Sequence, residues 1–338
     1  MIDTPYGFPP QRTPALLRNL MTELGDTADI RREEAITGRL ADPVAALDGR
    51  IGEALSIERA LESIAGYRSS IALAETRAQA TQAVFEQIRG LTDDLANQAQ
   101  VALENQTTGG LEIASTVAGE ALFTLTSALN TRVGGRSIFA GNAGDSPAIV
   151  EAGTILAEVT TIVEAAPNAG IAAADLRAAF DDAGGLFETA LYLGGNGDAP
   201  SAEVAAGERV DHGARADDPA IRDLLRAVAA LATAYDPDAV LTGDDRRKLA
   251  ESAVRDLRDT VEPINRLSAR VGVAEARIET VKARHVTEEA ALTRSYNALT
   301  GADTLLAASH LQEVEGQIEV LFLTTARLAN LSLVNFLR

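Results

Sequence analysis

The sequence predicts a mainly α protein: an elongated antiparallel helical bundle or coiled coil of the N- and C-terminal segments, with a β-hairpin and an inserted small α+β domain. Two observations predict it. Apolar residues recur every seven positions in both halves of the chain, as in helices that pack along one seam. Ala is abundant and aromatic residues are only 4% of the 338 residues, so the core should consist of small and aliphatic side chains.

The charge and cysteine content exclude several functions. The net charge is −19, from 30 basic and 49 acidic residues, which disfavours partners such as nucleic acid or an anionic membrane surface. The chain has no Cys, so disulfides and thiolate chemistry are excluded. The start, MIDTPYGFPPQRTP, has no apolar stretch of the kind found in cleaved secretory signals, so we expect none.

The N-terminal half predicts three helices. Thr13 and Pro14 fit a helix start, and this first helix should end near Thr37. Asp42 and Pro43 fit a second start, with a long helix from 44 to about 105 and a third over 111–131. The seam residues are Ile57, Ile64, Ile71, Ala78 and Phe85, then Ala60, Tyr67, Ala74, Thr81, Ile88, Leu95 and Ala102, continued by Ile113, Val117, Leu122, Leu125 and Leu129.

The middle of the chain predicts turns and short elements. Gly134 and Gly135 should end the third helix, and a β-prone run at 136–140 before the turn at 141–144 predicts a β-hairpin. Beyond residue 150 the composition changes. We expect short helices at about 154–165, 172–182 and 218–234, and strand-like pieces at 186–193 and 202–212.

The C-terminal half returns to helix at about Asp244. Pro263 should kink this helix or mark its true start. The sequence at 300–303 fits a stop followed by a new N-cap, Asp303. The seam residues are Leu257, Ile264, Val271, Ile278, His285, Leu292 and Leu299, flanked by Ala253, Leu267, Ala274 and Val281.

The last helix carries more apolar surface than one neighbour can cover. Thirteen of the residues 318–338 are apolar, and they lie on more than one face of a helix. Polar residues such as Arg327 and Asn330 interrupt the run, so it is too short for a membrane span. We therefore expect the segment to pack between copies of the chain. The expected assembly interface is Leu17, Met21, Leu24, Ala28, Leu311, Val314, Ile318, Leu321, Phe322, Leu328, Leu331, Leu333 and Phe336.

These patterns divide the chain into five parts. We expect an N-terminal assembly helix at 1–40, a bundle part with the hairpin at 41–150, and an inserted variable α+β domain at 151–243. The bundle returns at 244–300 and a C-terminal assembly helix follows at 301–338.

No pattern of residues points to catalysis. His285 occupies a heptad position and is interpreted as a polar core residue that sets register. The acidic loop at 236–245 lacks the spacing of a calcium loop, and the glycine loop at 194–197 opens no helix and lacks Lys. We predict no enzyme activity, no metal and no cofactor.

Four stretches in order resemble the flagellin family. They are 36–46 (ITGRLADPVAA), 130–148 (NTRVGGRSIFAGNAGDSPA), 270–277 (RVGVAEAR) and 326–337 (ARLANLSLVNFL). The first looks like a T-G-K/R element followed by D-P-V-A-A. The second is similar to the G-R-x-x-F-x-G hairpin of members found between hook and filament. The short linker before Pro43 and the absence of N-S-A-A-D-D-A-A-G also favour those members over filament flagellin.

The resemblance implies a structural role in the bacterial flagellum. Such a protein would join hook to filament by helical packing, outside the cell, after type III export without a cleaved signal. Its partners would be copies of itself, another hook-associated protein, flagellin and an export chaperone. Two alternatives remain: a filament flagellin, and a cytoplasmic coiled-coil adapter whose inserted domain binds a ligand.

Overall fold

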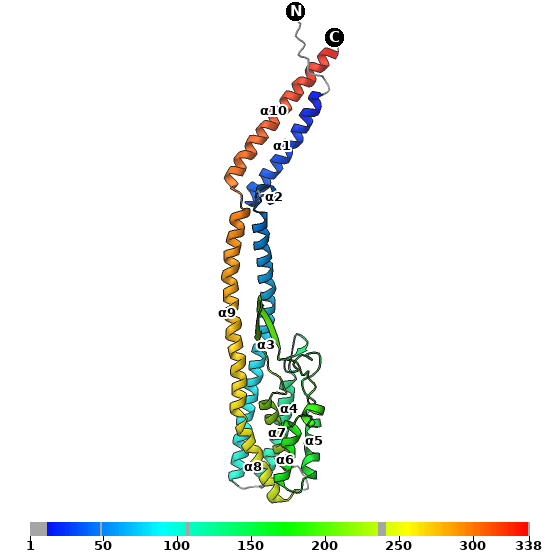
Figure 1. The fold of residues 1–338 in the computed structure, drawn as a ribbon, viewed down its shortest axis with the longest axis vertical. Helices are drawn as coiled ribbons and strands as arrows, with labels where there is room; N and C mark the ends of the chain where they lie inside the picture. Colours follow the sequence, from blue (N-terminus) through cyan, green and yellow to red (C-terminus); the bar gives the residue numbers. More distant parts are fainter. Residues whose placement is uncertain (1–11, 48, 106–107, 236–240, 337–338) are drawn as a thin grey trace, which may run out of the picture. The chain divides into compact units, whose positions relative to one another are not determined.

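The computed structural model describes residues 12–47, 49–105, 108–235 and 241–336 (Figure 1). Side chains are described for these residues except 12–14, 108 and 328–336. The chain divides into two compact units, which we treat separately. Unit 1 comprises Met1–Ile64 and Val286–Arg338, and unit 2 comprises Ala65–His285. The prediction of a mainly α chain with a β-hairpin is confirmed.

Unit 1 is built around two long helices. Helices α1 (Arg12–Thr37) and α10 (Thr304–Phe336) lie side by side and antiparallel (Figure 1). Their connections are joined by backbone hydrogen bonds, Ala302 N to Gly38 O at 2.9 Å and Leu40 N to Thr300 O at 2.8 Å. The short α2 (Pro43–Ala46) begins at Asp42, whose side chain accepts a hydrogen bond from Ala45 N.

Unit 2 contains the larger core. Its elements are the main part of α3 (Ile51–Glu104), α4 (Thr108–Leu129), β1 (Arg132–Val133), β2 (Arg136–Ser137), α5 (Ala152–Ala165), α6 (Ala169–Asp181), the π-helix η1 (Phe187–Leu191), β3 (Ser201–Ala205), β4 (Glu208–Asp211), α7 (Pro219–Ala234), α8 (Gly243–Asp259) and the first part of α9 (Val261–Thr300). Helices α3 and α9 run antiparallel, since Gln82 bonds to Ser268 and Glu75 pairs with Lys282.

Helix α7 forms the centre of this core. It packs against α4, α5, α6 and α8, and most of its side chains are buried. Ile155, Phe180 and Leu224 belong to the same apolar cluster as Leu95 and Leu257. The five-part division of the chain stays a prediction, but in the described residues segment 151–243 shares one core with the helices on either side.

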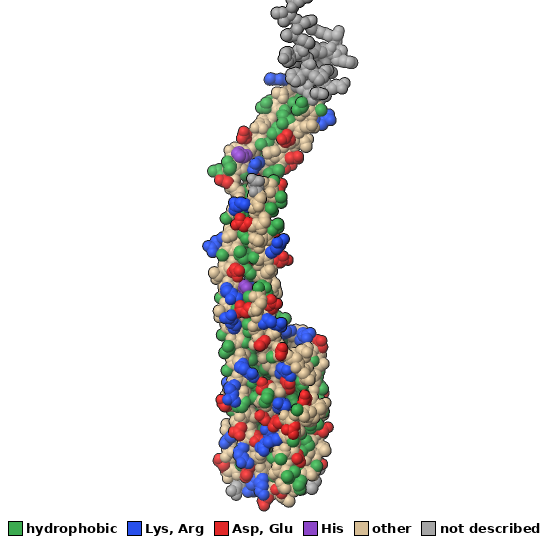
Figure 2. All heavy atoms as spheres, viewed as in Figure 1, with side chains coloured by type: hydrophobic (Ala, Val, Ile, Leu, Met, Phe, Trp, Pro, Cys, Tyr) green, Lys and Arg blue, Asp and Glu red, His purple; other side chains and the backbone are tan. Residues whose placement is uncertain are grey.

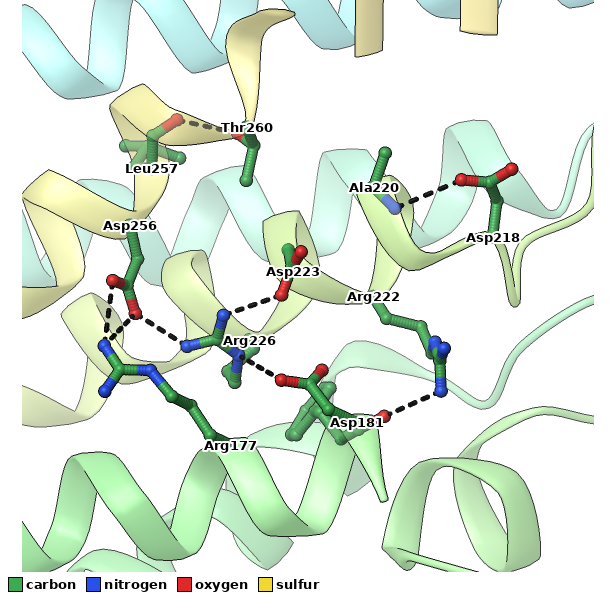
Figure 3. A network of polar contacts seen from close by, with 11 residues as sticks. Arg177, Asp181, Asp218, Ala220, Arg222, Asp223, Arg226, Asp256, Leu257 and Thr260 are labelled. Atoms are coloured by element: carbon green, nitrogen blue, oxygen red, sulfur yellow. Dashed lines mark hydrogen bonds and ion pairs between the residues drawn. The ribbon is translucent and has the colours of Figure 1, made fainter. Parts of the chain in front are cut away.

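A buried ion network holds α6, α7 and α8 together (Figure 3). The Arg226 guanidinium on α7 is 8% exposed and contacts Asp256 at 2.6 Å and Asp223 at 2.7 Å. Arg177 on α6 also contacts Asp256, at 3.0 Å. A buried guanidinium needs such partners because its desolvation is costly.

The heptad predictions hold for most seam residues. The first series, Ile57 to Phe85, is buried at every position, and so are Leu257, Ile264, Val271, Ile278 and His285. Ile113 is the one exposed seam residue, at 66%, and five further seam residues are half-buried: Ala60, Tyr67, Val117, Leu292 and Leu299. Pro263 lies in the first turn of α9, and the helix is broken at Thr260, so the residue marks a true start. Asp303 caps α10, as its carboxylate accepts from Leu305 N and Leu306 N.

Other sequence predictions were wrong in detail. The long helix begins at Ile51, not Val44. Gly49, between α2 and α3, has φ +89°, and this left-handed conformation interrupts the helix. The hairpin turn is Gly134-Gly135, where both φ angles are positive as in a type I′ turn, and not 141–144. Segment 186–193 contains η1 and no strand, and 202–212 is a two-stranded hairpin, β3–β4, turned by Gly207 at φ +69°.

Candidate assembly surface

The paired helices of unit 1 use their inner faces for each other. Among the predicted interface residues, Ala28, Val314 and Leu321 are buried in this chain alone. Half-buried positions complete the same faces: Leu17, Met21, Leu24, Leu311 and Ile318. These residues therefore already have a partner helix within the chain, although their role between copies stays a prediction. The side chains of Leu328, Leu331, Leu333 and Phe336 lie outside the described residues.

The base of the helix pair is held by polar contacts. Arg39 and Gly301 form a β-bridge, and the Arg39 guanidinium lies 5.9 Å from the centre of the Tyr296 ring. Glu34 is 4% exposed, and its carboxylate accepts from Arg31 at 2.7 Å and from Ala41 N at 3.4 Å. These bonds fix where α1 ends relative to where α10 begins.

The outer side of α10 is apolar as well. Leu305 and Leu323 are each nine residues from the buried Val314, or about 2.5 turns, which places them on the opposite face. They are 80% and 57% exposed. Val320, Leu306 and Phe322 add exposed fractions of 60%, 55% and 57%. Helix α10 is therefore apolar on more than one face in its described part.

Helix α1 adds apolar residues on a flank beside its inner face. Leu16, Leu20 and Ile30 are 68%, 43% and 40% exposed and share this flank by their spacing. Figure 2 shows hydrophobic side chains at the surface of this helix pair. We call the exposed apolar residues of α1 and α10 the outer surface: Leu16, Leu20, Ile30, Leu305, Leu306, Val320, Phe322 and Leu323. Of these residues, the predicted assembly interface included only Phe322. That prediction followed the apolar stripe through which α1 and α10 pair.

The outer surface can act by burial and not by bond chemistry. Each large apolar side chain stabilises a complex by about 1.5–3 kcal/mol when it is fully buried. An apolar face that stays exposed on one chain is typical of a site where another chain docks. The ion pair between Arg32 and Asp29, at 2.6 Å, is exposed and contributes little.

His285, the glycine loop and the acidic loop, which were weighed as possible sites from the sequence, make contacts typical of structural residues. His285 is buried, and its Nε2 lies 2.7 Å from Val204 O. In the glycine loop, Gly197 N donates to the Asn142 side chain at 3.4 Å. Thr242 caps α8, and its hydrogen bond holds the pKa of Asp245 below its usual value. Part of the acidic loop, 236–240, lies outside the described residues.

The described residues show neither a cluster of metal ligands nor a membrane-spanning helix. They contain no group of three or more His, Cys, Asp or Glu side chains placed to hold a metal ion. No described helix has a stretch long and apolar enough to cross a membrane.

Comparisons with known proteins identify the fold. No protein-family model and no curated protein matches the chain. A structure described as a flagellar hook-associated protein from Vibrio parahaemolyticus matches with a TM-score of 0.52 and 14% identity, covering 76% of this chain and 98% of that one. FlgL from Bacillus cereus matches with a TM-score of 0.52 and 13% identity, covering 72% and 99%. The chain therefore has the fold of these two solved structures.

Proposed function

We propose that this chain is a structural component of the bacterial flagellum that joins the hook to the filament. The observation that carries the proposal is the outer surface, which leaves both faces of the described part of α10 apolar although one is already covered by α1. The fold shared with two flagellar structures supports the same role.

The mechanism is packing between copies. The outer surface of one copy would be covered by the α1–α10 pair of the next, which removes exposed Leu and Phe side chains from water. A closed set of such contacts would give a ring or short tube of subunits. In this proposal the protein has no catalytic role. Its partners are further copies, another hook-associated protein, flagellin and an export chaperone, and it works outside the cell.

Electron microscopy of cells that lack the gene tests the proposal. We expect hooks without filaments, and filament protein released into the medium. Normal filaments on the mutant would overturn the proposal. Loss of the filament protein itself, together with thousands of copies of this chain in sheared filaments of the parent strain, would identify a filament flagellin instead. Absence of the chain from purified hook-basal bodies would favour a cytoplasmic adapter.

A truncation separates assembly from folding. Deleting 318–338 removes much of α10 and leaves unit 2 intact in sequence. We expect a soluble protein that keeps the helical signal of unit 2 in circular dichroism but does not support filament growth. Normal motility of cells carrying only the truncated protein would contradict an assembly role for α10.

A further inference from the structure

A small polar cavity lies inside unit 2 where α3 meets both β-hairpins. Its volume is about 170 Å³. The polar side chains around it are Arg77 and Thr81 of α3, Arg136 and Ser137 of β2, Ser201 of β3, and His212 directly after β4. Its lining residues include no Asp or Glu. The cavity is therefore surrounded by hydrogen-bond donors and positive charge, in a chain whose net charge is −19.

The two arginines have little counter-charge. Among the described residues, the Arg77 guanidinium makes no hydrogen bond or ion pair, although its side chain is half-buried. Arg136 contacts Asp145 at 3.5 Å, but that carboxylate is 87% exposed, so water screens the pair. Arg136 itself is 49% exposed, which leaves this side of the cavity open to solvent. Both guanidinium groups can thus donate to a further acceptor.

Two buried side chains of the cavity make no hydrogen bond of ordinary geometry. Ser137 is 5% exposed and His212 is 1% exposed. Neither Ser137 Oγ nor either ring nitrogen of His212 makes a hydrogen bond of ordinary geometry. Burial and the Arg77 charge lower the pKa of His212, while the carbonyls of Val210 and Pro200 partly oppose this shift. Buried polar groups in native structures nearly always have a partner, so Ser137 Oγ indicates a missing occupant, while the His212 ring also faces the carbonyls of Val210 and Pro200.

The arrangement of donors indicates the occupant's shape. The donors come from three separate segments of the chain: α3, β2 and the residue directly after β4. A carboxylate is planar and is matched by a single arginine, whereas a tetrahedral oxyanion presents oxygens in several directions. The cavity volume of about 170 Å³ exceeds the volume that one water molecule occupies in the liquid, about 30 Å³. We propose that it binds a small tetrahedral oxyanion, such as phosphate or sulfate, between Arg77, Arg136 and His212.

A bound oxyanion would stabilise unit 2. It would connect α3 to the β1–β2 hairpin and to the end of the β3–β4 hairpin. Since the unfolded chain lacks this site, binding raises the stability of the folded state with ligand concentration. This inference does not depend on the proposed flagellar role, and neither test decides the other.

The test measures inorganic phosphate binding to the full chain by equilibrium dialysis with radiolabelled phosphate. We expect saturable binding with one site per chain, displaced by sulfate and poorly by acetate. Arg77→Gln should weaken binding by about tenfold or more, because it removes a charge-assisted hydrogen bond. Arg89→Gln removes the same charge from an exposed position of α3 that does not line the cavity, and should bind as the parent does.

Thermal unfolding gives a second readout. Sodium phosphate should raise Tm above the value in sodium chloride of equal ionic strength, and Arg77→Gln should abolish the difference. If Arg77→Gln does not fold, Ser137→Ala replaces it, with a smaller expected loss of affinity. Three results would overturn the proposal: no saturable binding, so that the cavity holds water only; equal binding by Arg77→Gln and Arg89→Gln; or displacement by acetate as effective as by sulfate.

Discussion

The imidazole of His285 on α9 lies stacked on the ring of Tyr67 on α3, with 5.7 Å between ring centres and 10° between ring planes. Its Nε2 lies 2.7 Å from Val204 O on β3, and because a carbonyl can only accept, Nε2 carries the proton. His285 is 3% exposed. One buried side chain therefore links two helices and the β3–β4 hairpin.

Replacing His285 should loosen this junction. His285→Ala leaves the buried Val204 carbonyl without its donor and removes the ring stack, so we expect a loss of about 1–3 kcal/mol in the free energy of unfolding. Urea unfolding measures it, and amide exchange should quicken in β3 and β4. Val286→Ala, at a neighbouring side chain that is 53% exposed, is the control and should change stability little. Equal effects of the two substitutions would refute the role assigned to His285.

The ion network around Arg226 predicts a larger effect (Figure 3). Asp256→Ala removes the carboxylate that contacts both Arg226 and Arg177. The buried Arg226 guanidinium is then left with fewer carboxylate partners. We expect the free energy of unfolding of unit 2, measured with urea, to fall by about 3 kcal/mol. Breaking a buried ion pair leaves the remaining charge desolvated without compensation.

An exposed ion pair serves as the control for that prediction. Arg266 and Glu262 lie 2.9 Å apart on α9, with side chains 66% and 76% exposed. Arg266→Ala should cost less than about 1 kcal/mol, because water screens the pair and competes for its hydrogen bonds. If both variants lose the same stability, the network at Arg226 is no stronger than a surface contact.

Local patterns made most of the helical architecture predictable. Seven-residue spacing located the buried faces of α3 and α9, since residues seven apart lie on the same face of a helix. Pro263 and Asp303 marked helix starts because the physical constraints are local: a missing N–H in one and a capping carboxylate in the other. The errors arose where two local signals compete. Gly134 and Gly135 fit a helix end and a hairpin turn equally well, and only the pairing of Arg132 with Ser137 decides between them.

Features that depend on distant partners could not be predicted. Ile113 fits the seam by spacing, yet it is exposed because the packing of α4 onto α7 selects a different face. The outer surface was missed in part, since spacing does not say which of two apolar stripes α1 will cover. His212 carried no sequence signal, because its cavity is formed by residues from β2 and α3 that are far apart in the chain.

The tip of the β3–β4 hairpin should respond to acid. Hydrogen bonds from Arg284, at 2.8 Å, and from Arg277 hold the pKa of Glu208 below its usual 4.5. A carboxylate with a lowered folded-state pKa adds stability that is present above the unfolded pKa and is lost as pH falls through the folded pKa. The protection of the β4 amides, the ratio of intrinsic to observed exchange rate at each pH, should therefore fall below about pH 4.5, the unfolded value.

A pair of amide variants isolates this effect. Glu208→Gln should remove this acid-dependent loss of protection, and it should leave the protection at neutral pH lower than in the parent. Glu203→Gln, an exposed position on the paired strand, should keep the parent's pH response. An unchanged pH response in Glu208→Gln would show that another group controls the hairpin.

The last prediction concerns the outer surface, and it rests on the proposed function. Leu323→Asp places a charge at a side chain that is already 57% exposed, on the face of α10 opposite Val314. The monomer should keep its free energy of unfolding to within about 0.5 kcal/mol, because surface substitutions rarely change stability. Burying that charge between copies would be costly, so incorporation into flagella should fail.

Sheared flagella, probed for this chain, measure incorporation, and swimming in soft agar measures its consequence. Val273→Asp is the matched control: it adds the same charge at a side chain of α9 that is 72% exposed and lies outside α1 and α10. We expect the Val273 variant to be incorporated and the Leu323 variant to be absent, with equal amounts of both in cell extracts. Normal incorporation of Leu323→Asp would mean that copies meet through a different surface, because a buried carboxylate without a partner cannot be tolerated in an apolar contact.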